Sequence, residues 1–344
     1  MKKLLNTVYV TTEGAALRKD GDNLVADVDG AQRSRVPLHM LAGVVAFGAI
    51  HISPALIAAL AGAGITLTLL DRNGRFQARI DGPTSGNVLL RRAQYRACDT
   101  PEEIVRSMLI GKIANQRAVL MRALRDHGDD DPPTARDALR RAAERLAQIL
   151  RRVELADETL ERLRGSEGEA ANLYFSVFDH LIRAPDVELR WRGRSRRPPL
   201  DPVNALLSFL YTLLTHECRS ALETVGLDPA AGFLHRDRPG RPSLALDLME
   251  ELRPILADRL ALSLINRRQL RARDFETKEG GAVLMSEEAR RTVLTAWQER
   301  KREERTHAFL GEKAPLGLVP HLQAQMLSRH LRGDMDAYPP WFWK

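Results

Sequence analysis

The chain has 344 residues, enough for one large domain or for two domains that each bury a core. Its formal net charge of +7 and its pI of about 9.7 favour polyanionic partners, nucleic acid first and acidic membranes second. The two cysteines, Cys98 and Cys218, lie far apart and outside any CxxC pattern, which argues against a disulfide framework and a structural zinc site.

No segment has the pattern of a secretory signal or a membrane span. The first residues lack a long apolar core, and the most apolar stretch, Val44 to Leu70, is interrupted by glycines and by Pro54. We therefore expect a cytoplasmic protein without a membrane partner.

The first part of the chain, residues 1–82, is predicted to form a small, mainly β domain. Short alternating or β-branched runs are separated by turn signals such as Asp20–Asn23. The predicted strands are Thr7–Thr11, Leu24–Val28, Gly43–Phe47 and Ile65–Leu70. Only Ser53–Ala61 has helical spacing in this part.

A change of composition at residues 83–87 predicts a linker, and residues 88–344 are then almost entirely helical in pattern. Leucine, alanine, arginine and glutamate dominate, and all four favour helices. The predicted helices include Asn87–Tyr95, Pro101–His127, Ala135–Leu163 and Glu169–Arg183. The expected fold class is α+β, with the N-terminal β domain followed by a larger all-α catalytic domain.

Glu167 stands between Gly165 and Gly168, at what the pattern indicates is the start of a helix. If Ser166 is the N-cap, Glu169 occupies the third helical position and completes a capping box. Glu169 then has a structural role and Glu167 has none. Flanking glycines would let a backbone or a ligand approach closely.

A second group of polar residues follows well downstream. His235 lies in an arginine-rich loop, and Ser243 is expected to cap a helix on which Asp247 and Glu250 share one face. Two carboxylates and a histidine suit Mg²⁺ or Mn²⁺ and leave positions for a phosphate. A hydrolytic triad of Ser243, His235 and Asp247 is disfavoured, because no GxSxG elbow is present.

Two arginine clusters would hold a nucleic-acid backbone. One surrounds Trp191 and the other flanks His235, and contacts of this kind give affinity without sequence reading. The candidate DNA-binding residues are Arg192, Arg194, Arg196, Arg197, Arg236, Arg238 and Arg241.

These motifs, in this order, resemble those of the CRISPR-associated integrase family, the first Cas protein of the adaptation module. Gly165–Phe175 resembles its GxEGxAAxxYF signature, and Asp201–Ser208 its DPxNALLSF helix. His235 with Gly240–Leu244, and then Asp247–Glu251, resemble its histidine and acidic motifs. The sequence around His235 and the aromatic tail are most similar to those of the type I-C subgroup.

The resemblance implies a set of site residues. It carries metal ligands onto Glu167, His235 and Asp247, and a further acidic position onto Glu250, which binds the metal either directly or through water. Positions that line or support the site are matched by Tyr174, Asn204 and Ser243. The implied cofactor is Mg²⁺ or Mn²⁺.

The resemblance also implies DNA integration. Similar proteins form homodimers, two of which sandwich a dimer of the small second Cas protein and bind a short double-stranded prespacer. Each catalytic subunit joins a prespacer 3′-hydroxyl to a repeat border of the CRISPR array by transesterification, and the same site cuts branched DNA. A Cas4-family nuclease that trims the prespacer is a further implied partner.

Two other functions stay open on the residues alone. A structure-specific endonuclease would use the same metal site with water as the nucleophile, and a non-enzymatic scaffold would bind DNA without changing a strand. The apolar C-terminal tail, Tyr338–Trp343, is expected to pack on its own domain, with a partner surface as the alternative.

Overall fold

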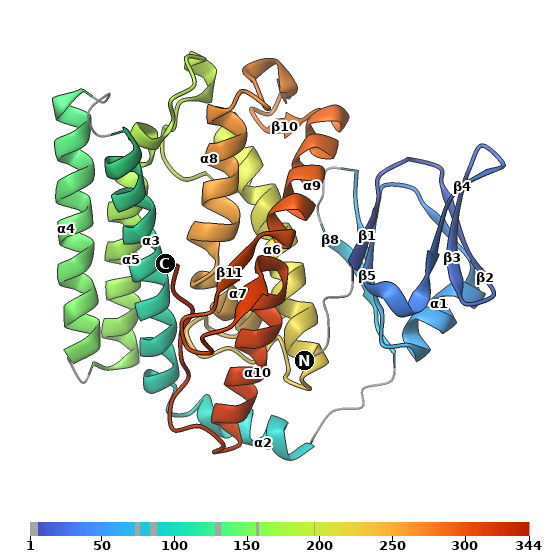
Figure 1. Cartoon of the computed structure of the whole chain (residues 1–344), viewed down its shortest axis with the longest axis horizontal. Helices are drawn as coiled ribbons and strands as arrows, with labels where there is room; N and C mark the ends of the chain where they lie inside the picture. Colours follow the sequence, from blue (N-terminus) through green and yellow to red (C-terminus); the bar gives the residue numbers. More distant parts are fainter. Residues whose placement is uncertain are drawn as a thin grey trace. The chain divides into compact units, whose positions relative to one another are not determined.

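The computed structural model describes residues 6–72, 76–82, 88–127, 132–155, 158–195 and 197–343. The chain divides into two compact units, Met1–Ser85 and Gly86–Lys344, and each is described by itself (Figure 1). The predicted linker, residues 83–87, lies outside the described residues.

The N-terminal unit contains two four-stranded sheets. In the first, three parallel strands are followed by an antiparallel one, in the order β1 (Asn6–Val10), β5 (Leu41–Phe47), β7 (Thr66–Leu70) and β8 (Phe76–Ile80). The second has the order β4 (Ala31–Pro37), β3 (Asn23–Val28), β2 (Ala16–Asp20) and β6 (His51–Ile52). The four strands predicted from sequence are confirmed as β1, β3, β5 and β7.

The only α-helix among the described residues of this unit, α1 (Pro54–Gly62), packs on its core. Ser53 is its N-cap, and the Ser53 hydroxyl accepts a hydrogen bond from the Leu56 N–H at 3.3 Å, which satisfies a donor that the helix itself leaves unpaired. Leu56 and Leu60 are buried in the same cluster as Leu17 of β2 and Val44 of β5. The helix predicted at Ser53–Ala61 is thus confirmed.

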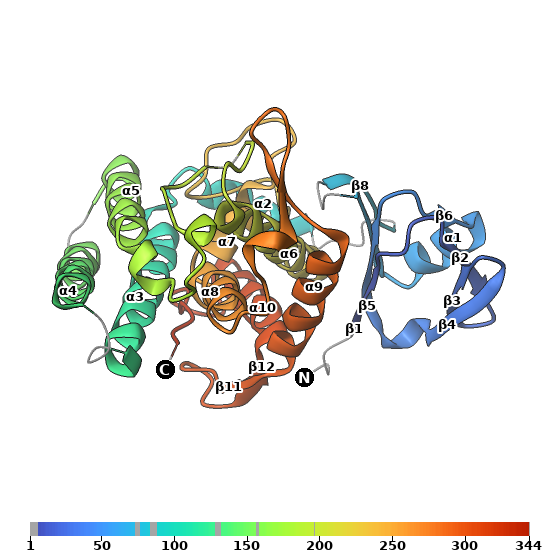
Figure 2. The same cartoon turned by 90° about the horizontal axis from the view of Figure 1, so that it is seen from above.

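The second unit is mainly helical (Figure 2). Its helices are α2 (Val88–Ala97), α3 (Glu102–His127), α4 (Pro133–Leu155), α5 (Leu160–Ser176), α6 (Pro202–Thr224), α7 (Ser243–Glu250), α8 (Arg259–Asn266), α9 (Glu287–Arg302) and α10 (Val319–Leu331). Two short antiparallel hairpins interrupt them, β9 (Phe275–Thr277) with β10 (Val283–Met285) and β11 (Glu304–Thr306) with β12 (Lys313–Pro315). Within the described residues, no helix is both long and apolar enough to cross a membrane.

Helix α3 is the centre of this unit. It packs against α4 and α5, which lie beside it in both views (Figures 1 and 2), and against α7. Met108, Leu109 and Ile113 are fully buried on it. Lys112 is buried among them, so a positive charge lies inside the helical unit.

The helix predicted as Ala135–Leu163 is in fact two helices, because α4 ends at Leu155 and α5 begins at Leu160. Thr159 is the N-cap of α5, so the prediction that Ser166 is an N-cap and that Glu169 completes its capping box is wrong. Glycines in a helix interior cost about 1 kcal/mol each, but Leu163, Ala170 and Tyr174 continue one buried face across this stretch.

Glu169 connects two helices and caps neither. Its carboxylate pairs with Arg145 at 2.8 Å and with Arg152 at 2.7 Å, both on α4. Arg152 also donates to the hydroxyl of Ser166 at 3.1 Å. The two residues assigned to a capping box therefore hold α5 against α4, and Glu167 projects elsewhere.

Candidate functional site

The structure brings three charged side chains from three helices together. The ammonium of Lys112 on α3 pairs with the Glu167 carboxylate on α5, and it lies 2.6 Å from Glu250 Oε2 on α7. Glu167 is 29% exposed, whereas the side chains of Lys112 and Glu250 are 3% and 2% exposed. One cation thus bridges the two carboxylates at the edge of the buried interior.

Glu250 is held ionised by its neighbours. The guanidinium of Arg253, one turn later in the chain, lies 2.9 Å from Glu250 Oε1. Burial by itself raises the pKa of Glu250, but Arg253, Lys112 and His235 outweigh it and lower that pKa to about 2. A buried carboxylate that stays charged is available as a ligand for a cation.

Asp247 is fully buried, and both of its oxygens accept hydrogen bonds. Oδ2 accepts from the N–H groups of Phe233 at 2.6 Å and Leu234 at 3.0 Å. Oδ1 accepts from the His235 N–H at 3.0 Å and lies 2.6 Å from His235 Nδ1. Because a carboxylate can only accept, Nδ1 carries the proton and Nε2 of a neutral His235 presents its lone pair.

The loop that carries His235 is fitted closely onto α7. A Cβ on Gly232 would lie 2.7 Å from the Ser243 Cβ and 2.9 Å from Asp247 Oδ2, so this position requires glycine. Arg164 on α5 donates to the Leu234 carbonyl at 2.9 Å, which ties the loop to the helix of Glu167 as well.

Ser243 does not cap α7, contrary to the prediction. It is the first helical residue, the N-cap position belongs to Pro242, and no side chain caps the helix there. The Ser243 hydroxyl instead donates to the Arg236 carbonyl at 3.3 Å. Ser243 therefore binds the backbone of the loop at Arg236, the residue after His235.

Glu167, His235 and Glu250 supply donor types that a hard divalent cation accepts. His235 Nε2 lies 4.0 Å from Glu250 Oε1, and two acceptors at that distance favour a positive charge between them. The Lys112 ammonium shows that the space between Glu167 and Glu250 accepts a cation. As the side chains stand, the described residues hold no group of three or more His, Cys, Asp and Glu that could bind a metal.

A cavity of about 280 Å³ adjoins these residues. Lys112, Glu167, Arg194, Arg253 and Asp258 are among the side chains that line it. Positive groups therefore outnumber the carboxylates in this part of its wall, which suits an anionic ligand such as a phosphate.

Arg194, Arg253 and Asp258 of the cavity lining also belong to a polar network with Tyr211. The Tyr211 hydroxyl donates to Asp258 at 2.6 Å, and the guanidinium groups of Arg194 and Arg253 lie over the Tyr211 ring at 5.2 and 4.6 Å. Burial raises the pKa of Asp258 to about 6, against the effect of these partners. Burial, reinforced by the Asp258 charge, likewise raises the pKa of Tyr174 well above its usual value.

Asn204 organises the segment that carries the first arginine cluster. Its Oδ1 accepts from Arg194 at 2.5 Å and from the Ser195 N–H at 3.1 Å, and its Nδ2 donates to the Gly193 carbonyl at 2.7 Å. Asp201 caps α6 and holds Asn204 in turn. Asn204 therefore sets the position of Arg194 in the cavity wall.

The predicted DNA-binding arginines differ in their surroundings. Trp191 is buried against Phe175, so the first cluster has a packed aromatic base. Arg192, Arg197 and Arg238 are exposed, Arg241 is half-buried, and Arg196 lies outside the described residues. Arg236 is exposed but pairs with Glu161 at 3.1 Å.

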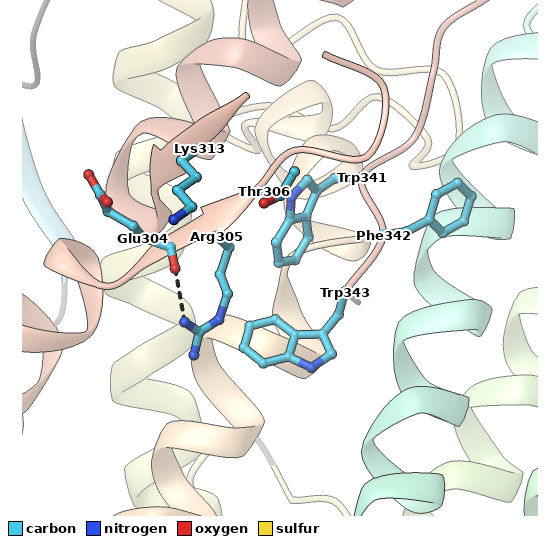
Figure 3. Close-up of a pocket in the computed structure, with 7 residues that line it drawn as sticks. All are labelled: Glu304, Arg305, Thr306, Lys313, Trp341, Phe342 and Trp343. Atoms are coloured by element: carbon cyan, nitrogen blue, oxygen red, sulfur yellow. Dashed lines mark hydrogen bonds between the residues drawn. The ribbon is translucent and has the colours of Figure 1, made fainter. Parts of the chain in front are cut away.

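The aromatic tail packs on its own unit, as expected. Tyr338 and Trp341 are each 1% exposed. The guanidinium groups of Arg259, Arg300 and Arg305 lie 4.5, 5.4 and 5.0 Å from the centre of the Trp343 ring. Trp343 also lines a cavity together with residues of β11, β12 and the tail (Figure 3).

Sequence reasoning missed three residues that build the site, Lys112, Gly232 and Arg253. The signal for Lys112 was a single lysine inside the apolar run Met108–Ile113, where a charge needs a partner. Gly232 and Arg253 carry no local signal, because their roles depend on what another element places beside them.

Known proteins match the chain over its whole length. The family model described as CRISPR associated protein Cas1 matches residues 8–299. A CRISPR-associated endonuclease Cas1 of Rhodospirillum rubrum is 71% identical over 344 residues, and one of Chlorobaculum tepidum is 53% identical over 347, each match covering 100% of both chains. A Cas4/Cas1 fusion of Geobacter sulfurreducens is 36% identical over 96% of this chain and 59% of the fusion.

Solved structures share the fold. A chain of a Cas6-RT-Cas1–Cas2 complex superposes with a TM-score of 0.82 at 24% identity, covering 100% of this chain and 36% of that one. A casposase bound to its integration product gives 0.80 at 22%, covering 97% of this chain and 92% of that one. At these identities the likeness is one of fold, and the sequence matches establish the family. The chain belongs to the Cas1 family of CRISPR-associated proteins.

Proposed function

We propose that this protein is a metal-dependent DNA integrase and endonuclease of CRISPR adaptation, of the type I-C subgroup. It joins the 3′-hydroxyl ends of a prespacer to the repeat borders of the array. The observation that carries the proposal is that Glu167 and Glu250 meet at Lys112, with His235 Nε2 4.0 Å from Glu250 Oε1, beside a cavity whose lining includes Arg194 and Arg253. Membership of the Cas1 family and a fold shared with a casposase support it.

We assign Glu167, His235 and Glu250 to holding Mg²⁺ or Mn²⁺. When bound, the ion polarises a phosphoryl oxygen of the attacked phosphodiester and stabilises the leaving oxyanion. Asp247 was predicted as a direct ligand; because both of its oxygens accept hydrogen bonds, we propose instead that it orients His235. Glu250, whose direct contact was left open, takes the ligand position in this proposal.

The cavity wall would bind the DNA backbone. A phosphate in the cavity would meet the positive groups of Lys112, Arg194 and Arg253, which position it without reading sequence. In strand transfer, the prespacer 3′-hydroxyl attacks a phosphodiester and a 3′-oxygen of the repeat strand leaves. One phosphodiester forms as one breaks, so no ATP is required.

The proposed assembly is a homodimer, two copies of which flank a dimer of the small second Cas protein, with the N-terminal unit in dimerisation and partner contact. A Cas4-family nuclease is a further proposed partner, supported by the Cas4/Cas1 fusion among the relatives. A fold shared with a chain of a Cas1–Cas2 complex supports the second Cas protein. The proposed location is the cytoplasm, because the proposed substrate is the array DNA.

An in vitro assay with labelled prespacer and a repeat-bearing plasmid tests the proposal. We expect joined strands with Mg²⁺ or Mn²⁺, and none after Glu167→Ala or His235→Ala, while both variants dimerise as the wild type does. Full activity of either variant would refute the site. Products that are only shortened would indicate hydrolysis, and DNA binding that is unaffected by EDTA without any strand change would indicate a scaffold.

A further inference from the structure

The aromatic tail, residues 338–343, contacts the end of α7 next to the proposed ligand Glu250. Glu251 is fully buried, and its carboxylate accepts from the Tyr338 hydroxyl and from the Trp341 N–H at 2.7 Å. Gln323 of α10 donates to the same carboxylate at 2.9 Å and to the Pro339 carbonyl at 3.1 Å. Two of the three groups that donate to Glu251 thus belong to the tail.

The tail is also hydrogen-bonded to α3, the helix of Lys112. Asn115, one turn after Lys112, donates from Nδ2 to the Glu251 carbonyl at 2.7 Å and to the Trp341 carbonyl at 3.0 Å. Its Oδ1 accepts from the Trp343 N–H at 2.8 Å. A single buried amide therefore joins α3, the end of α7 and the tail.

The backbones also approach closely here. A Cβ on Gly111, the neighbour of Lys112, would lie 2.9 Å from the Pro340 Cβ and 3.0 Å from the Glu251 Cβ. Because Gly111 has no side chain, the tail packs directly against Gly111 and Glu251, which are the chain neighbours of Lys112 and Glu250.

We propose that the tail is a strap that positions Lys112 and Glu250, and hence the metal and phosphate site; this inference rests on the proposed function. Without the tail, the buried Glu251 carboxylate keeps one donor and Asn115 loses two partners. Buried polar groups left without partners reorganise, which displaces the end of α7. Misplacement of a catalytic group by about 1 Å is enough to cost about 100-fold in rate.

The strap makes a prediction that differs from that of a tail which only stabilises the fold. A merely stabilising tail would lower the unfolding midpoint and leave kcat unchanged below it. A strap lowers kcat in the folded protein while the KM for DNA changes little, because the exposed arginines Arg192, Arg197 and Arg238, assigned above to the DNA backbone, are not among the tail's partners.

The experiment compares the full-length protein with a chain lacking residues 338–344, with Tyr338→Phe and with Trp343→Ala. Tyr338→Phe removes the hydroxyl on Glu251 with almost no change of volume. Trp343→Ala is the matched control, since its indole contacts Arg259, Arg300 and Arg305 and the N–H bonded to Asn115 is retained. Steady-state strand joining and hydrogen exchange of residues 247–252 are measured well below each unfolding midpoint.

We expect the deletion to lower kcat about 10-fold or more, with KM within about twofold, and amide exchange of residues 247–252 to quicken about 10-fold. Tyr338→Phe should lower kcat about threefold, and Trp343→Ala should stay within about twofold of wild type. If the deletion does not fold, Tyr338→Phe decides the matter by the same two measurements.

Unchanged exchange together with a kcat within about twofold in the deletion or in Tyr338→Phe would overturn the strap. A loss in Trp343→Ala as large as that in the deletion would overturn it too. A failure of the proposed function is distinguishable: the intact protein would then join and cut no DNA strand, while the exchange of residues 247–252 would still report whether the tail holds α7.

Discussion

Asp247→Asn provides the sharpest test of how His235 is held. The change keeps the shape of the side chain but replaces one of its two oxygens by an NH₂ group. In the wild type each carboxylate oxygen accepts two N–H groups. In either orientation of the asparagine amide, its NH₂ group therefore faces two N–H donors in place of an acceptor. With the NH₂ toward His235, Nδ1 must become the acceptor, the proton moves to Nε2, and the Nε2 lone pair that the proposed metal site requires is lost.

The structure sets the expected magnitudes. Two hydrogen bonds to a fully buried charged group, at about 1.5 kcal/mol each, make the loss of unfolding free energy about 3 kcal/mol. A partner of this kind behind a ligating histidine is worth about 10- to 100-fold in metal affinity or activity. We therefore expect Mn²⁺ affinity and strand joining to fall together by that factor, with DNA affinity in EDTA retained.

The assay combines Mn²⁺ titration by calorimetry with ¹⁵N NMR of the His235 ring, which distinguishes the two tautomers. Asp274→Asn is the control: Asp274 also accepts a backbone N–H, that of Arg271 at 2.7 Å, but it lies in a short turn before β9. An Asp247→Asn protein with wild-type Mn²⁺ affinity, unfolding free energy and Nδ1–H tautomer would refute the reasoning.

Three further predictions follow from the site. Lys112→Met leaves Glu167 and Glu250 without their bridging cation and should lower the free energy of unfolding in EDTA by about 3 kcal/mol. Mn²⁺ should then raise the melting temperature of this variant more than that of the wild type. An equal or smaller rise would contradict a cation position shared by Lys112 and the metal. Asp258 has a pKa raised from 3.8 to about 6, so the folded protein holds its proton more tightly and loses stability as pH rises through that window. Relative to Asp258→Asn, the wild type should lose about 2 kcal/mol between pH 4 and pH 7 in denaturant titrations, and a pH-independent difference would refute the shift. Arg238→Ala should reduce the salt dependence of DNA binding by about one phosphate contact and leave the melting temperature unchanged. Arg194→Ala should reduce the salt dependence and also lower the melting temperature, because Arg194 donates to Asn204; an unchanged melting temperature in Arg194→Ala would contradict this structural role.

The fold could be predicted in outline because its signals are local. Alternation and turn residues indicated β1, β3, β5 and β7, and the spacing of leucine and alanine indicated the helical part. The break between α4 and α5 was missed, since the helix-forming residues on either side continue the same pattern. Gly165 and Gly168 indicate a helix start in the sequence, although the buried face from Leu163 to Tyr174 continues across them.

The sequence by itself determined which candidate site residues are present: Glu167, His235, Asp247 and Glu250 stand in an order that predicts a metal site acting on DNA. Only the tertiary structure decided what surrounds each of these residues. Hydrogen-bond donors from the Gly232–His235 loop occupy Asp247, whereas Lys112 and Arg253 keep Glu250 charged beside the cavity. Spacing along one helix predicts which side chains share a face. The residues that contact that face come from α3, α5 or the C-terminal tail, which are far away in the chain, so that only the packing of these elements brings them together.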